Sequence, residues 1–241
     1  MRNEWSNAKS REYTRKYKNL GFSKDMALRV YTTRLLGRNK ELVLHGGGNT
    51  SVKTTIKDID GKKYEVLCVK GSGWDMADIE PPGLPAVKLE PLLSLKKKKY
   101  LSDEDMVAYQ KRNLIDIKSP NPSVETFLHA FLPFKYVDHT HADAVMNITN
   151  RPGGLNFCKK VFGNKVSVVP YVMPGFMLSK KIHEIYSKNP NINCLILMNH
   201  GIFTFANDCK EAYDLMIKYV TKAEKAVKKL KSKKIKQIKN F

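Results

Sequence analysis

The stretch YVDHTHADAV, residues 136–145, places two histidines two positions apart among small and apolar residues. In a β-strand, side chains at positions i and i+2 point to the same face, so His139 and His141 would lie side by side. On a helix the same spacing would turn them roughly 200° apart, which suits chelation poorly. We therefore interpret the stretch as a strand whose two imidazoles can bind one metal ion. From the spacing alone, a surface strand that carries two histidines without a ligand is an equal alternative.

Length and composition are those of an ordinary globular chain. The 241 residues fit one domain, and a hydrophobic fraction of 42% provides enough material for a core. The polar N-terminus and the lack of a long apolar run predict neither a secretory signal nor a membrane span. The four cysteines are far apart in the sequence and are interpreted as buried thiols in a reducing compartment: Cys68, Cys158, Cys194 and Cys209. We therefore expect a single-domain cytoplasmic protein.

The net charge of +20 could indicate an anionic partner. Lysines concentrate at residues 95–100 and 222–241, without the signature of a zinc finger, an RNA-recognition motif or a helix-turn-helix. We interpret them as a solvated surface and do not expect nucleic-acid binding. The basic tail, about residues 231–241, is expected to be frayed or disordered.

Helical and strand patterns alternate along the chain, which predicts an α/β fold with three layers, α/β/α, around a mixed central sheet. Ser23 is expected to cap the first long helix. Helices are predicted at residues 24–39, 84–95, 103–112, 123–133, 177–188 and 208–230. Strands are predicted at residues 41–45, 63–70, 165–172 and 193–201, and at the stretch from Tyr136 that carries both His139 and His141.

A third histidine follows the apolar run LILMN, residues 195–199, at the carboxyl end of a predicted buried strand. Sites in α/β sheets tend to collect at such ends. Alone, His200 would be interpreted as a core histidine with its hydrogen bonds satisfied. Together with His139 and His141 it completes three imidazoles, a common catalytic zinc arrangement, so the metal site becomes the preferred interpretation.

Glu125 lies in the predicted first turn of the helix that leads into the histidine strand. Acidic residues are common there because of the helix dipole alone. The functional interpretation is a carboxylate near the metal that takes a proton from a carbon next to a carbonyl. His129, four residues later on the same helical face, is interpreted as structural.

Two glycine loops end predicted strands: HGGGNTS, residues 45–51, and KGSGWD, residues 70–75. Glycine lets the backbone approach an anion, and the side chains of Asn49, Ser51 and Ser72 can donate hydrogen bonds to it. Neither loop matches a Walker or Rossmann pattern. Taken singly, both could equally be ordinary turns.

The motifs HGGGNTS, KGSGWD, PSVETFLHAFLP, VDHTHADAV and LMNHGIFTF follow one another as in the class II aldolase/adducin family. The chain resembles this family from about Leu36 to Val227. It looks closest to the aldolase part of bacterial proteins that join a rhamnulose-1-phosphate-aldolase-like domain to a short-chain dehydrogenase. The resemblance implies the catalytic residue Glu125, metal ligands and a phosphate site. The implied metal ligands are His139, His141 and His200, and the implied phosphate site is Gly48, Asn49, Ser72, Gly73 and Ser123.

The implied activity is that of a zinc-dependent lyase. It would cleave or form a ketose 1-phosphate, such as rhamnulose 1-phosphate, through a metal-stabilised enediolate, giving dihydroxyacetone phosphate and an aldehyde. Gly47 and Val124 stand where simpler sugar-phosphate aldolases of the family often carry hydroxyl residues, so the chain has fewer groups to bind a phosphate.

Two alternatives stay open: a sugar-phosphate 4-epimerase of the same family, and a non-catalytic adducin-like binding module. Retention of all three histidines favours an enzyme, because the adducin branch has lost metal ligands. The resemblance further implies a homotetramer with active sites between subunits. Either the protein acts alone, or a dehydrogenase partner is encoded elsewhere.

Overall fold

The computed structural model describes the backbone of residues 1–238 and the side chains of residues 1–230. Within these residues, a mixed seven-stranded sheet has the order β3-β2-β1-β4-β7-β6-β5. Neighbouring strands are antiparallel except β5 and β6, which are parallel. The strands are β1 (Asn49–Lys57), β2 (Lys63–Val69), β3 (Ala86–Lys88), β4 (Tyr136–Thr140), β5 (Val166–Val169), β6 (Cys194–Leu197) and β7 (Gly201–Ala206).

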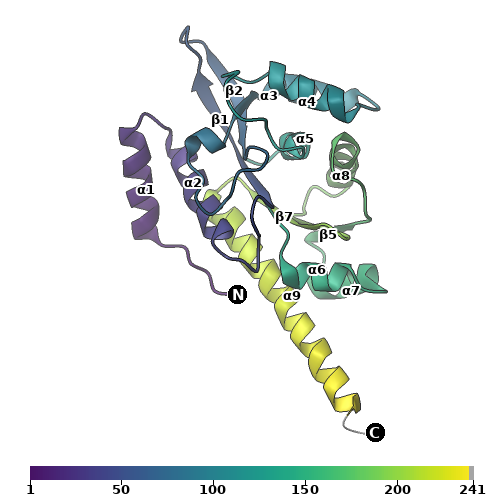
Figure 1. The fold of residues 1–241 in the computed structure, drawn as a ribbon. Helices are drawn as coiled ribbons and strands as arrows, with labels where there is room; N and C mark the ends of the chain where they lie inside the picture. The colour runs from purple at the N-terminus through teal and green to yellow at the C-terminus, as the bar shows by residue number, and fades with distance from the viewer. Residues whose placement is uncertain (239–241) are drawn as a thin grey trace.

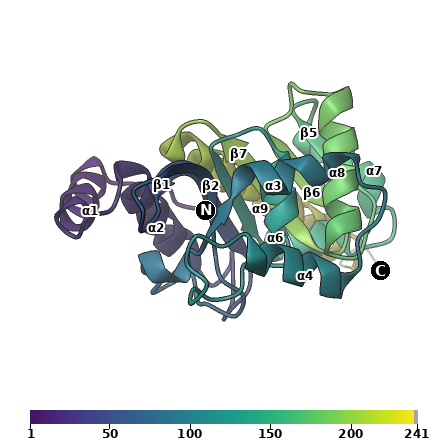
Figure 2. The same ribbon diagram turned by 90° about the horizontal axis from the view of Figure 1, so that it is seen from above.

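Helices cover both faces of the sheet, which confirms the predicted α/β class (Figure 1). Seen from above, α3, α4 and α8 lie together at the end of the molecule opposite α1 (Figure 2). The α-helices are α1 (Asn7–Asn19), α2 (Lys24–Gly37), α3 (Leu89–Ser94), α4 (Asp103–Arg112), α5 (Thr126–Phe131), α6 (Asp143–Thr149), α7 (Gly154–Phe162), α8 (Phe176–Lys188) and α9 (Cys209–Ile238). Single 3-10 turns lie at Pro81–Gly83 and Leu95–Lys97.

The alternation of side chains along each strand sends apolar residues into two separate cores. On one face of β2 and β6, Val66 and Ile196 join a cluster covered by α2, α6, α7 and α9. On the other face, Leu67 and Leu195 join clusters covered by α3, α5 and α8. Strand β4 lies in the middle of the sheet and is buried along its whole length. The side chains on its two faces therefore lie in two different environments.

Several predicted elements are confirmed. The Ser23 side chain accepts a hydrogen bond of 3.2 Å from the Met26 amide and caps α2. The strand at β2 and the helices at α4 and α8 lie close to their predicted ranges. The four cysteines are free and buried, as expected. No helix in the described residues is long and apolar enough to cross a membrane.

Three predicted elements differ from the structure. Residues 41–45 form turns instead of a strand, because the amides of Leu42 and Val43 both donate to the Asn39 carbonyl at the end of α2. Residues 84–95 do not form one helix, because Ala86–Lys88 pairs with β2 and buries Val87 before α3 begins. The helix predicted from Ser123 begins at Thr126.

The apolar run that contains His200 is also divided. Strand β6 ends at Leu197, and β7, which the sequence prediction missed, begins at Gly201 and pairs back against it. Asn199 turns the chain with a φ of 57°, a conformation that asparagine tolerates better than most residues. His200 consequently lies in a tight turn and not at a strand end. The predicted basic tail lies beyond the described side chains and stays a prediction.

Candidate metal site

Three histidines converge beside the carboxyl end of β4. The ligand nitrogens of His139, His141 and His200 all lie within 4.8 Å of one another. His139 is the last-but-one residue of β4, His141 follows that strand directly, and His200 comes from the β6–β7 turn. Because β4 pairs with β7 in an antiparallel manner, His139 and His200, some 60 positions apart in the sequence, lie at the same edge.

Two glycines allow this close packing. A Cβ atom at Gly201 would lie 2.4 Å from the Thr140 carbonyl oxygen and 3.1 Å from Cε1 of His139. At Gly48, where φ is +59°, a Cβ would lie 2.7 Å from the His139 carbonyl oxygen. Any side chain at either position would therefore displace the histidine strand or its rings.

The hydrogen bonding of His139 leaves one nitrogen for a ligand. Its Nδ1 lies 3.1 Å from the Ile202 carbonyl oxygen and donates to it, so Nε2 carries the lone pair. This Nε2 atom is buried and has no hydrogen-bond partner among the described residues. The ring stacks on Phe203 with centroids 4.0 Å apart, which fixes its plane. A metal-binding histidine is typically held this way, with its other nitrogen bonded to a carbonyl.

Burial keeps the three imidazoles neutral. It holds the pKa of His139 well below its ordinary value, with smaller contributions from His141 and His200. Burial also lowers the pKa of His141 and lowers that of His200 to about 4. Neutral imidazoles offer lone pairs, which a divalent cation requires. The residues present therefore fit a three-histidine metal site.

Glu125 faces this cluster. Its Oε2 lies 3.4 Å from Nε2 of His139, and its Oε1 lies 3.5 Å from Nε2 of His200. The carboxyl group is buried, which raises its pKa to about 7, while a hydrogen bond from Asn49 opposes the rise. Its Oε1 has no hydrogen-bond partner among the described residues. Glu125 is the residue just before α5 and not in its first turn, because Ser123 turns the chain and pairs its amide with the Lys70 carbonyl.

The residues of the predicted phosphate site lie on three segments that meet beside Glu125. Asn49 donates a hydrogen bond of 3.1 Å to the Ser123 hydroxyl and one of 2.7 Å to Glu125. Ser72 is exposed, and its amide donates to the Asn121 carbonyl at 2.8 Å. Gly73 is exposed with a φ of +77°, and its carbonyl oxygen would lie 3.7 Å from a Cβ on Gly46.

Only part of this set is free to bind a ligand in the structure described. Both amide hydrogens of Asn49 are already directed to Ser123 and Glu125, so a phosphate oxygen would have to displace one of them. The Ser123 hydroxyl oxygen accepts from Asn49 and from the Glu125 amide, which leaves its own hydrogen for a ligand.

The sequence prediction missed Lys70. The side chain is buried, and its Nζ donates to the carbonyl oxygens of Gly46 at 3.1 Å and Trp74 at 2.6 Å. It thus ties the two glycine loops together and places a cation beside His141, whose pKa it helps to lower. Burial lowers the pKa of Lys70 itself to about 8. In the sequence, Lys70 could have been singled out because it comes directly before the Gly-Ser-Gly of the second glycine loop.

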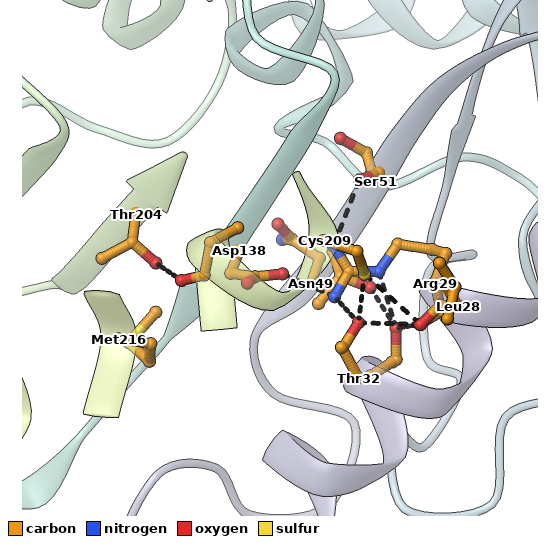
Figure 3. Close-up of polar contacts among 12 residues, drawn as sticks. Leu28, Arg29, Thr32, Asn49, Ser51, Asp138, Thr204, Cys209 and Met216 are labelled. Atoms are coloured by element: carbon orange, nitrogen blue, oxygen red, sulfur yellow. Dashed lines mark hydrogen bonds and ion pairs between the residues drawn. The ribbon is translucent and has the colours of Figure 1, made fainter. Parts of the chain in front are cut away.

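A second polar cluster lies on the opposite face of β4 (Figure 3). Asp138 lies 2.6 Å from Nη2 of Arg29, and both side chains are fully buried. Arg29 also donates to the hydroxyls of Thr32 and Thr33 and to the Ser51 carbonyl oxygen. Burial raises the pKa of Asp138, and Arg29 opposes this rise. The pair holds α2 against β1 and β4, on the face of β4 opposite the three clustered histidines.

Comparison with known proteins identifies the family. A family model described as the Class II Aldolase and Adducin N-terminal domain matches residues 27–227, so the chain belongs to the class II aldolase/adducin family. The chain is 41% identical over 198 residues to a Bacillus subtilis protein named uncharacterized oxidoreductase YuxG. That alignment covers 82% of this chain but only 29% of the relative.

Solved structures agree with this assignment. The N-terminal class II aldolase domain of a conserved protein from Thermoplasma acidophilum superposes with a TM-score of 0.82 at 41% identity, covering 94% of this chain and 99% of that one. A sugar-phosphate aldolase from Thermotoga maritima superposes with a TM-score of 0.60 at 17% identity, covering 83% and 95%. At that identity the second match supports the fold alone.

Proposed function

We propose that the chain is a zinc-dependent aldolase that cleaves, or forms, a ketose 1-phosphate such as rhamnulose 1-phosphate. The products would be dihydroxyacetone phosphate and an aldehyde. The observation that carries the proposal is the position of Glu125, a buried carboxyl group within 3.5 Å of two of the three clustered histidines. A purely structural glutamate would gain little from a site in which one of its oxygens has no partner.

Each group has a distinct part in the proposed reaction. His139, His141 and His200 would hold a divalent cation, which supplies Lewis-acid polarisation of the substrate carbonyl. When the C3–C4 bond breaks, the C4 hydroxyl would release its proton to solvent and become the aldehyde, and the electron pair would stay with the three-carbon fragment. Glu125 would give a proton to C3 of that fragment and regain one from solvent, and it would take the C3 proton in the synthetic direction. A pKa of about 7 suits both directions at neutral pH.

The phosphate would bind at the glycine loops, with Ser72, Gly73 and the Ser123 hydroxyl as donors. Gly48 and Asn49 complete this side of the site. Support comes from the exposure of Ser72 and Gly73 and from the nearby cationic Lys70.

A substrate screen tests the proposal. Zinc-loaded protein, purified without a histidine tag, is incubated with a panel of ketose 1-phosphates, and the aldehyde and dihydroxyacetone phosphate are assayed separately. Equal release of both supports an aldolase, whereas an epimeric sugar without free aldehyde would support the 4-epimerase. No turnover of any member would contradict the proposal and favour a binding module.

The Glu125→Gln variant tests the role of the carboxyl group. The amide has the same shape but cannot accept the proton, so the rate should fall on the order of 10²–10⁴-fold. Zinc content and fold should be retained. Near-normal turnover would limit Glu125 to a structural role at the start of α5.

The proposal includes a cytoplasmic homotetramer with shared active sites. Because the net charge is +20, subunits repel one another at low salt, and apolar interface area must outweigh that repulsion. Light scattering should therefore show tighter assembly at moderate than at low salt. A fully active monomer under both conditions would contradict shared sites.

A dehydrogenase partner, which would oxidise the aldehyde product, is part of the proposal as well. The name oxidoreductase belongs to a relative of which this chain spans only 29%. Adding a nicotinamide-dependent aldehyde dehydrogenase to the screen would drive cleavage forward if the aldehyde is its substrate.

A further inference from the structure

One face of β1 carries a row of polar side chains that contact α5 from end to end. Asn49, Ser51 and Lys53 point to this face because they are two residues apart. Asn49 bonds Glu125 before the helix, and Ser51 bonds His129 in its middle. The Lys53 Nζ donates to the carbonyl oxygens of His129, Leu132 and Phe134 at the end of the helix, at 2.9, 2.7 and 2.7 Å. The start of α5, and with it Glu125, is thereby fixed relative to the histidine strand.

Two side chains of this row, Asn49 and Ser51, form one buried hydrogen-bond chain with His129 and Glu125. The Ser51 hydroxyl lies 2.7 Å from Nδ1 of His129, and Nε2 of His129 lies 2.6 Å from the Asn49 side-chain oxygen. The Asn49 amide nitrogen then lies 2.7 Å from Oε2 of Glu125. His129 is completely buried, so water does not compete for these bonds.

The chain of bonds has a single direction. The Asn49 side-chain nitrogen donates to both Oε2 of Glu125 and the Ser123 hydroxyl oxygen, so Asn49 presents its NH2 group to Glu125 and its oxygen to His129. An amide oxygen can only accept, so His129 must carry its proton on Nε2. Nδ1 of His129 is then unprotonated and accepts from the Ser51 hydroxyl. Every donor in the chain therefore points toward Glu125.

This direction distinguishes the two oxygens of Glu125. Oε2 receives the Asn49 hydrogen bond, whereas Oε1 has no hydrogen-bond partner and lies 3.5 Å from Nε2 of His200.

We propose that His129 and Ser51 are positioning residues that orient Asn49, so that its amide hydrogen bond fixes Oε2 of Glu125 and directs Oε1 at the histidine cluster. This assignment rests on the proposed function of Glu125 as the proton-transferring group. It also gives His129, which sequence reasoning treated as structural, a defined part in the site.

Three variants test the role of His129, all measured as zinc-loaded protein. His129→Leu removes the N–H donor, and the rate at saturating substrate should fall about 10–100-fold, as for other partners that orient a site. His129→Gln retains an N–H near the position of Nε2 and should recover most of that loss. His183→Leu, at a histidine on α8 outside the chain of bonds, is the matched control and should behave as wild type. Zinc content and KM should change little in all three.

Nitrogen-15 NMR of histidine-labelled protein provides a readout independent of activity. His129 should be neutral with its proton on Nε2, and Ser51→Ala should weaken this preference by removing the donor to Nδ1. A proton on Nδ1, or a charged ring, would overturn the inference. Equal rate losses in His129→Leu and His129→Gln would also overturn it, because that result indicates packing alone.

Failure of the proposed function has a different signature. If wild-type protein turned over no ketose 1-phosphate, the aldolase proposal would fail while the NMR spectrum still reported the state of His129. If wild type were active and His129→Leu equally active, only the positioning role would fail. Should His129→Leu not fold, the rate and spectrum of Ser51→Ala decide between the same outcomes.

Discussion

The two faces of strand β4 place buried polar groups in opposite situations. On one face, Asp138 lies beside the cation of Arg29, which also reaches two threonine hydroxyls and a backbone carbonyl. On the other, His139 and two further histidines face the carboxyl group of Glu125, which forms no ion pair with a lysine or arginine of the described residues. Neighbouring residues of one strand are thus fully buried for different reasons.

This difference distinguishes a polar group that stabilises the fold, Asp138, from polar groups that can bind a ligand, the histidines and Glu125. A buried charge beside an opposite charge is compensated within the chain, so it needs nothing else. Buried atoms without a hydrogen bond occur on both faces. The Asp138 oxygens have the Arg29 guanidinium 2.6 Å away, whereas single atoms of His139, Glu125 and His200 lie together with no arginine or lysine of the described residues in an ion pair with Glu125. Burial and polarity alone would not distinguish the two faces; the pattern of partners does.

Breaking the ion pair should have the largest effect on stability. Asp138→Asn leaves the Arg29 charge buried without its partner, and the free energy of unfolding should fall by about 3–5 kcal/mol in urea titrations. Replacing both residues, by Arg29→Met with Asp138→Leu, should recover much of this loss. The folded fraction of each variant should still bind zinc.

The exposed pair Lys181–Glu184 on α8 is the control for this prediction. Removing it by Glu184→Gln should change the free energy of unfolding by less than about 1 kcal/mol. An equal loss of unfolding free energy in Asp138→Asn and in Glu184→Gln would contradict the stabilising role given to the Asp138–Arg29 pair.

Relative to the Glu125→Gln variant, the metal-free protein should lose stability as pH rises from about 4.5 to about 7, whereas the buried histidines of lowered pKa give both proteins an opposite slope. In the folded state the pKa of Glu125 is raised to about 7 from 4.5, so the folded state binds the proton more tightly than the unfolded state. The resulting stabilisation is complete below pH 4.5 and is lost through pH 7, amounting to at most about 3 kcal/mol. Unfolding of EDTA-treated protein between pH 5 and pH 8 measures it.

Glu125→Gln should lack the Glu125 contribution, because an amide does not titrate, so the free energy of unfolding of the variant should rise more steeply between pH 5 and pH 7 than that of wild type. Parallel curves for wild type and variant would show that other groups cause the slope.

Zinc should stabilise wild type but not a ligand variant. At a free concentration of 100 times Kd, one bound ion raises the free energy of unfolding by about 2.7 kcal/mol. His141→Ala should abolish the shift, and the control His183→Ala, at a histidine outside the cluster, should retain it. A shift that survives in His141→Ala would place zinc elsewhere.

The sequence predicted the class of fold and the three histidines that cluster, because these signals are local. His139 and His141 lie two residues apart at the end of β4, with ring centroids 4.8 Å apart, and Ser23 caps α2. Boundaries that depend on pairing with distant residues were wrong. The strand at Ala86–Lys88 forms because β2 is available as a partner, which the sequence around Val87 does not reveal.

The organisation around Glu125 could not be predicted for the same reason. Asn49 and His129 are 80 residues apart and share a hydrogen bond only after β1 pairs with β4 and α5 packs above them. Arg29 and Asp138 likewise meet only through the packing of α2 on the sheet. Sequence patterns identified these side chains as polar or apolar, whereas their partners followed from the topology.

The metal content of the untagged protein tests the central claim most directly. Elemental analysis should find one divalent ion, zinc or an equivalent, per chain, either as purified or after addition of Zn²⁺ and removal of the excess. The variants His139→Ala and His141→Ala should fall well below that ratio, since two remaining histidines hold an ion weakly. Wild-type protein that remains substoichiometric after zinc addition would contradict the account of this face of β4.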